Sequence, residues 1–147
     1  MSLPPKGERR PDPMSYGAAI PSGFGVNLLY AALEPALRWQ AEVLEAQVLY
    51  WEDHFVIVRW GPSTWFAHSD WSYRDHPMTG AVQGVEARGP GAELRLYGLD
   101  PDAAEARART AGTPVLAGAL DKPHGLRESY LLDPEGYVWV PGVPLSG

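Results

Sequence analysis

The sequence predicts an α+β domain built from two βαβββ units in tandem. The order strand, helix and three strands is indicated twice along the chain. Shifting the chain against itself by 67 positions aligns Leu29-Tyr30 with Leu96-Tyr97 and Val48-Leu49 with Val115-Leu116, without a gap. The 147 residues, of which 45% are hydrophobic and 20% charged, suit one domain with a buried core.

The first unit is expected at about residues 24–69. Apolar residues at near-helical spacing follow a short alternating strand, and Pro35 stands where the first turn of a helix tolerates proline. A polar turn joins the next two strands as a hairpin, and Gly61-Pro62 separates the last one. The expected elements are a strand at 26–30, a helix at 33–44 and strands at 47–51, 55–60 and 64–68.

The second unit is expected at about residues 91–142. Asp100 and Pro101 supply an N-cap and a first helical residue, and Gly112 suits the end of that helix. The run Asp133-Pro134-Glu135-Gly136 has the chemistry of a tight turn between the last two strands. The expected elements are a strand at 93–99, a helix at 103–111 and strands at 114–117, 127–132 and 137–140.

Three segments carry no predicted element. Residues 1–22 are rich in Pro, Gly and charge and are expected to form a flexible N-terminal tail, and 143–147 a short C-terminal one. Residues 70–90 are expected to be an irregular connection between the modules. A connection of this length inside a small domain is often functional.

Composition excludes several classes of function. The chain has no cysteine, which removes disulfides, thiolate metal sites and cysteine nucleophiles. A net charge of -6 disfavours nucleic-acid binding and favours neutral or cationic ligands. No apolar run reaches the length of a membrane span, and no export signal is recognisable. A cytoplasmic protein without membrane partners is expected.

One family resemblance rests on three stretches of sequence. ESYLLDPEGYVWVPG, from Glu128 to Gly142, resembles the closing hairpin of the vicinal oxygen chelate superfamily, which includes glyoxalases, bleomycin-resistance proteins and extradiol dioxygenases. DPDAAEARARTAGTPVL and LEPALRWQAEVLEAQVLY resemble the helix and following strand of each module. The similarity covers about residues 24–142. It implies an open, curved mixed sheet, a ligand or metal in the concavity, and, as in many members, a homodimer.

The resemblance also implies where a metal would bind, and the donors are missing there. The family's metalloenzymes take ligands from the first and last strand of each module. The corresponding positions here are Gly25 or Val26, Phe66, Ala92 or Glu93, and Val140. Val140 stands where those enzymes usually have glutamate, and one carboxylate does not hold a metal. His68 and His76 show no metal-binding spacing, so no metal or other cofactor is expected.

Aromatic residues are the alternative basis for a pocket. Trp71 and Tyr73 stand in the polar connection, and their rings would stack on a flat or cationic ligand or pack as a small satellite core. Other tryptophans lie on strands, where core packing competes with a place in the groove. Glu93, Arg95 and Tyr97 alternate on one face of a strand. The candidate ligand-binding residues are Trp60, Trp65, Trp71, Tyr73, Glu93, Arg95, Tyr97 and Trp139.

The leading hypothesis is a metal-independent small-molecule-binding protein. It would sequester an antibiotic or an aromatic or cationic metabolite in an aromatic-lined groove, as the bleomycin-resistance branch does. The alternative is a lyase or dioxygenase of the glyoxalase superfamily with an atypical metal site. A metal-free enzyme would need Glu93 or His68 as a general base, but no nucleophile–base pair is apparent, so no catalytic residue is assigned. A regulatory module that senses a metabolite stays open.

Overall fold

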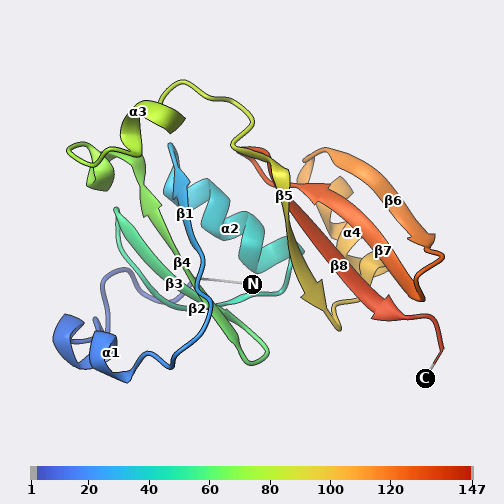
Figure 1. Cartoon of the computed structure of the whole chain (residues 1–147), viewed down its shortest axis with the longest axis horizontal. Helices are drawn as coiled ribbons and strands as arrows, with labels where there is room; N and C mark the ends of the chain where they lie inside the picture. The colour runs from blue at the N-terminus through green and yellow to red at the C-terminus, as the bar shows by residue number, and fades with distance from the viewer. Residues whose placement is uncertain (1–2, 147) are drawn as a thin grey trace.

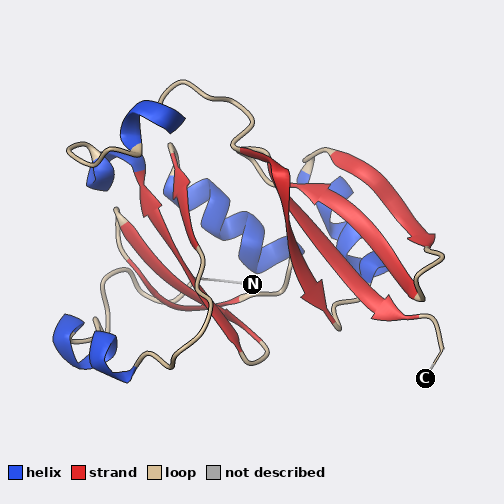
Figure 2. Ribbon diagram, in the orientation of Figure 1, coloured by secondary structure: helices blue, strands red, loops and turns tan. Residues whose placement is uncertain are grey.

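Each βαβββ unit forms its own four-stranded mixed sheet with one long helix packed on it. The computed structural model describes residues 3–146. Figures 1 and 2 show the two sheets beside each other, with strands β1 and β5 as the edges that approach the middle of the molecule. Both sheets are open, and the predicted α+β class and tandem βαβββ order are confirmed.

Sheet A belongs to the first module and has the strand order β1-β4-β3-β2. Strand β1 runs parallel to β4, and the other neighbours are antiparallel. Helix α2 carries Pro35 in its first turn and buries an apolar stripe that includes Leu37 and Val43. The elements are β1 (Asn27–Tyr30), α2 (Leu33–Val43), β2 (Gln47–Trp51), β3 (Phe55–Trp60) and β4 (Ser63–Ser69).

Sheet B belongs to the second module and repeats this topology with the order β5-β8-β7-β6. Strands β5 and β8 are parallel. Helix α4 begins after Asp100, whose carboxylate accepts hydrogen bonds from two backbone N–H groups, and ends at Gly112 in the left-handed region. The elements are β5 (Gly89–Tyr97), α4 (Pro101–Ala111), β6 (Val115–Asp121), β7 (Leu126–Leu132) and β8 (Tyr137–Pro144).

The core lies between the two helices and the sheet faces that they cover. Helices α2 and α4 also touch each other, so the two modules share one hydrophobic cluster. On β4, Trp65 and Ala67 belong to this core, which places Phe66 and His68 on the opposite face of sheet A. On β5, Leu96 belongs to the core, which places Arg95 and Tyr97 on the opposite face of sheet B.

The connecting and terminal segments hold more regular structure than the sequence predicted. Residues 70–90 contain the 3-10 helix η1 (Asp70–Tyr73), the short helix α3 (Thr79–Val82) and the start of β5. Helix η1 begins where the Ser69 hydroxyl accepts a hydrogen bond from Ser72 N at 3.2 Å. Strand β6 continues to Asp121, well beyond the predicted end at 117.

The N-terminal segment also contains a helix. Helix α1 (Pro13–Ala19) starts after Asp12, which accepts a hydrogen bond from Ser15 N at 2.9 Å. Upstream, Trp51 Nε1 donates to the Pro4 carbonyl at 2.7 Å, which attaches the segment to β2. Residues 1–2 and 147 of the two expected tails lie outside the described residues. No helix among residues 3–146 is long and apolar enough to cross a membrane.

Candidate functional site

A buried chain of hydrogen bonds joins the two modules and fixes the positions of two tryptophans. Trp65 Nε1 donates to Gln40 Oε1 at 3.0 Å, and Gln40 Nε2 donates to the Tyr30 hydroxyl at 3.1 Å. That hydroxyl donates to Asp133 Oδ2 at 2.5 Å, and Trp139 Nε1 donates to the same oxygen at 3.1 Å. The indoles of Trp65 and Trp139 meet with their ring centroids 5.5 Å apart.

Asp133 is the first residue of the Asp-Pro-Glu-Gly turn, and it is almost wholly buried. Its second oxygen accepts hydrogen bonds from the backbone N–H groups of Glu135 and Tyr137, at 2.9 and 3.1 Å. Burial raises the pKa of Asp133, and these hydrogen bonds oppose the rise. Burial, followed by the neighbouring Asp133, also raises the pKa of Tyr30 well above its usual value, so the phenol stays protonated as the donor.

A cleft of about 280 Å³, the junction cleft, opens where β4 and the residues just before β1 meet β5 and β8. Trp65 and Trp139 form part of its apolar lining, together with Phe24, whose side chain is almost fully exposed at 96%. Glu93 and Arg95 bring charge to the same cleft. Four of the eight predicted site residues therefore meet here. The other lining residues are Val26, Ser63, Thr64, Leu94 and Leu96.

Carboxylates surround the guanidinium of Arg95. Nη1 donates to Glu93 Oε1 at 2.5 Å, Nε donates to the Tyr97 hydroxyl at 3.1 Å, and Nη2 pairs with Glu128. Burial lowers the pKa of Arg95, but hydrogen bonds to Glu93, Tyr97 and Tyr130 outweigh it and leave that pKa raised. All three nitrogens are engaged, so Arg95 is not free to bind an anion.

Glu128 is the buried member of this group, with no side-chain exposure. Its Oε1 lies 3.1 Å from His124 Nε2 and accepts a hydrogen bond from the Tyr130 hydroxyl at 3.3 Å. Two carboxylates thus face one guanidinium on this face of sheet B. His124 and Lys122, whose Nζ lies 5.1 Å from the Tyr130 ring, adjoin the same group, and the exposed carboxylate of Glu93 is its member that lines the cleft.

The residues at the family's metal positions do not fit a divalent ion. Val140 has no donor atom and is buried between β5 and β7 in the sheet. Glu93, the one carboxylate among these positions, is paired with Arg95. Within residues 3–146, no three His, Asp or Glu side chains converge as metal ligands would. No chemical step is therefore assigned to a metal.

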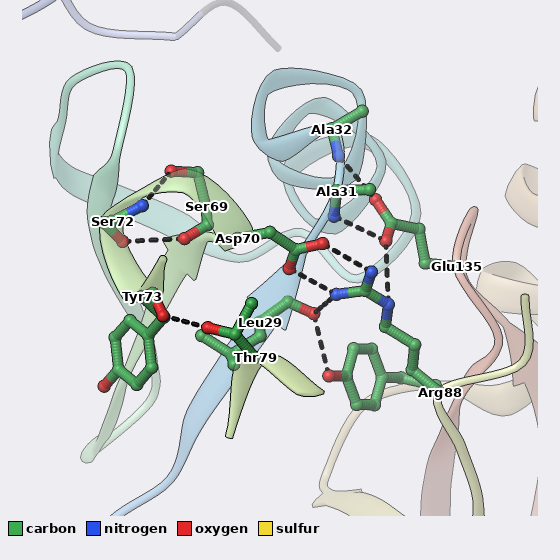
Figure 3. A network of polar contacts seen from close by, with 11 residues as sticks. Leu29, Ala31, Ala32, Ser69, Asp70, Ser72, Tyr73, Thr79, Arg88 and Glu135 are labelled. Atoms are coloured by element: carbon green, nitrogen blue, oxygen red, sulfur yellow. Dashed lines mark hydrogen bonds and ion pairs between the residues drawn. The ribbon is translucent and has the colours of Figure 1, made fainter. Parts of the chain in front are cut away.

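A second polar cluster, the inter-module clamp, holds the connection against both modules (Figure 3). The Arg88 guanidinium, only 3% exposed, forms two hydrogen bonds of 2.6 Å with Asp70 and one of 3.1 Å with the Leu29 carbonyl. Glu135 lies 3.4 Å from Arg88 Nε and accepts hydrogen bonds from the backbone of Ala31 and Ala32, at 2.7 and 2.8 Å. The clamp keeps β1, the connection and the β7–β8 turn together.

The four remaining predicted residues lie outside the cleft. Trp60 packs on the core at the end of β3, and its ring would lie 3.3 Å from a Cβ on Gly98. Tyr97 points to solvent on β5. In η1, Trp71 stacks on His54 with centroids 4.4 Å apart and lies under the Arg74 guanidinium, so its ring already has partners within the chain.

Tyr73 instead contacts two histidines that the sequence could not connect. Its ring centroid lies 5.2 Å from that of His68 and 4.7 Å from that of His76. Asn27 Nδ2 donates a hydrogen bond to the Tyr73 hydroxyl at 2.9 Å. Burial lowers the pKa of His68, which favours the neutral imidazole.

Sequence reasoning missed several residues of the site. Phe24 and Val26 lie at the cleft because the chain before β1 runs past β5, which no periodicity reveals. Glu128 was missed because a charged residue on a strand is usually solvated. Strand alternation was the signal available. Ser129 faces helix α4, where its hydroxyl donates to the Pro101 carbonyl, so the neighbouring Glu128 points to the opposite face of the sheet.

Comparisons with known proteins identify the fold. No family model matches the chain, and no curated protein matches it. Its structure is similar to a glyoxalase/bleomycin resistance protein/dioxygenase from Nocardioides, with 18% identity, a TM-score of 0.65, and coverage of 91% of this chain and 93% of that chain.

Two further structures agree. A glyoxalase-related enzyme from Fulvimarina pelagi has 16% identity and a TM-score of 0.66, covering 84% of this chain and 88% of that chain. TioX from Micromonospora sp. ML1 has 21% identity and a TM-score of 0.61, with coverage of 86% of this chain and 98% of that chain. The chain has the glyoxalase/bleomycin-resistance/dioxygenase fold, as the resemblance identified from its sequence implied.

Proposed function

We propose that this protein binds a small aromatic cation, without a metal, in the cleft between its two modules. One observation carries the proposal. Apolar and aromatic side chains line the cleft, and on its β5 side the exposed carboxylate of Glu93 shares Arg95 with the buried Glu128. A net charge of -6 for the whole chain adds to the attraction for cations.

The walls and the charge select for different parts of one ligand. Phe24 offers an exposed ring, and Trp65 and Trp139 offer buried indoles whose N–H groups are already used. Flat apolar surface is the natural partner for these groups, and a cation near an aromatic ring gains about 0.5–2 kcal/mol. Glu93, with an exposed carboxylate, is the group that a ligand's positive charge would approach.

Sequestration fits this site better than metal-dependent lyase or dioxygenase chemistry. Those reactions need a Lewis acid or an oxygen-activating metal, and Val140 and the paired Glu93 do not provide its ligands. The similar structures whose names include bleomycin resistance are consistent with binding as a function of this fold. Their low identity supports the fold alone, so the ligand is inferred from the charges and walls of the cleft.

The test uses two probes of the same shape. 1-Methylquinolinium is a flat cation, and 1-methylnaphthalene is its uncharged isostere. Quenching of tryptophan fluorescence reports binding, because Trp65 and Trp139 line the cleft. We expect the cation to bind at least about tenfold more tightly, which corresponds to about 1.4 kcal/mol.

Glu93→Gln should weaken binding of the cation about tenfold and leave binding of the naphthalene unchanged. Glu34→Gln is the matched control, because it also removes a carboxylate paired with an arginine but lies on α2 outside the cleft. Equal affinity for the two probes, or an equal effect of the two variants, would contradict the proposal.

A further inference from the structure

Phe24 is a large apolar residue that stands in solvent where two hollows of the surface meet. It is 96% exposed, and its ring is not part of the hydrophobic core. It lines the junction cleft and also a cavity of about 410 Å³ between α1 and β4. Val26, Ser63 and Thr64 line both hollows as well, so Phe24 lies at their common border.

Glycines flank Phe24 on both sides. Gly23 has a φ of +145°, which other residues rarely adopt, and a Cβ built on Gly23 or Gly25 would meet no atom within 4 Å. Residues 20–25 form neither helix nor strand along the path from α1 to β1 (Figure 1). Rotation about the two glycines therefore turns the phenyl ring without moving β1, which pairs with β4 from Asn27 onward.

The chain before this hinge is packed loosely. Helix α1 buries none of its residues, and Met14 is 82% exposed. Tyr16 touches sheet A through Phe66, with ring centroids 6.0 Å apart. Farther upstream, the hydrogen bond from Trp51 to the Pro4 carbonyl fixes the chain at β2. The segment is thus anchored at both ends and weakly held between them, which lowers the cost of a local movement.

The empty cleft offers Phe24 little aromatic surface to stack on. Trp65 and Trp139 line the cleft, but they pack on each other and are only 6% and 2% exposed. A flat ligand that lies against this wall presents its free face to the phenyl ring. A saturated ligand of the same charge has no such face, so Phe24 distinguishes the two.

We propose that Phe24 determines the specificity of the junction cleft by closing over an aromatic ligand. The inference rests on the function proposed above for that cleft. In the closed arrangement the ligand ring lies between Phe24 and the wall formed by Trp65 and Trp139. The ligand's positive charge beside the phenyl ring adds a cation–π attraction to the stacking.

The first test compares 1-methylquinolinium with 1,1-dimethyldecahydroquinolinium, a saturated bicyclic cation of the same charge. Phe24→Leu keeps an apolar side chain but removes the ring. By isothermal titration of the full chain, this variant should bind 1-methylquinolinium about tenfold more weakly and the saturated cation as the wild type does. Phe55→Leu, on β3 outside the cleft, is the matched control and should change neither affinity. An equal effect of Phe24→Leu on both cations, or on neither, would overturn the proposal.

Fluorine-19 NMR observes the closure itself. The chain has three phenylalanines, so labelling with 4-fluorophenylalanine gives three signals, and Phe24→Leu identifies the one from residue 24. A soluble nitroxide should broaden this signal strongly in the free chain, and saturation with 1-methylquinolinium should protect it. A signal that stays equally broadened in the saturated complex would overturn the closure and leave the binding function intact. A wild-type chain that binds neither cation would overturn both proposals.

Discussion

Replacing Gly136 by alanine tests how tightly the connection is docked on the β7–β8 turn. Gly136 has a φ of +86°, and a Cβ built there would lie 2.8 Å from Ala87 Cα and 3.2 Å from Ala87 Cβ. The nearest atom belongs to the backbone, so no side-chain rotation relieves the contact. Arg88 N donates to the Glu135 carbonyl at 3.0 Å, and this bond resists separation of the two segments.

Two costs add in this variant. An alanine in the left-handed region costs about 1–2 kcal/mol. Forcing a methyl group into a packed contact costs about 1–3 kcal/mol more. Gly136→Ala should therefore lower the free energy of unfolding by about 2–5 kcal/mol. Gly125 has a φ of +93°, and a Cβ built there would have no neighbour within 4 Å. Gly125→Ala should therefore incur only the backbone cost, about 1–2 kcal/mol.

Urea unfolding followed by circular dichroism measures both values. The unfolding free energy is the midpoint urea concentration multiplied by the slope m. A shift in the midpoint therefore measures lost stability only if each variant keeps the wild-type m value. If Gly136→Ala loses no more stability than Gly125→Ala, the connection is not packed on the turn as described.

Three further perturbations follow from the buried polar groups, and urea unfolding measures each. Burial lowers the pKa of His68 in the folded chain below its usual 6.5, so the unfolding free energy should fall as the pH drops from 6.5 through that lowered pKa. His68→Phe should flatten this pH dependence, and a profile that the substitution leaves unchanged would refute the prediction. Arg88→Met leaves two carboxylates of the clamp without their cation and should cost about 3–5 kcal/mol, whereas a loss below about 1 kcal/mol would show that the clamp contributes little. Tyr30→Phe removes a donor from the buried Asp133 carboxylate and should cost about 1–3 kcal/mol, and a neutral effect would contradict the network that links the modules.

The fold was largely predictable because its signals are local. Alternation, helical spacing and capping residues such as Asp100 and Gly112 act within a few positions, and most helices and strands of the structure lie where they indicate. Helix α1 was missed because it buries no residue, so it has no apolar stripe to detect. Asp12 followed by Pro13 was the local signal available, since it pairs an N-cap with a proline at the first helical position.

The site was only half predictable because it depends on which face of each strand is covered. Alternation separates Trp65 from Phe66, but the packing of α2 decides that Trp65 belongs to the core. The hydrogen bond between Asn27 and His68 joins residues 41 positions apart, and it exists only because β1 and β4 are paired. Such contacts follow from topology, which short-range patterns do not encode.

The central claim, binding in the junction cleft without a metal, is tested most directly by one titration. The protein is dialysed against EDTA, its metal content is measured, and 1-methylquinolinium is titrated before and after addition of Ni²⁺, Zn²⁺, Mn²⁺ or Fe²⁺. We predict no ion retained in near-stoichiometric amount and an affinity that is unchanged by any of the four metals. A retained ion that Glu93→Gln releases, or binding that requires a metal, would contradict the claim and favour the metalloenzyme alternative.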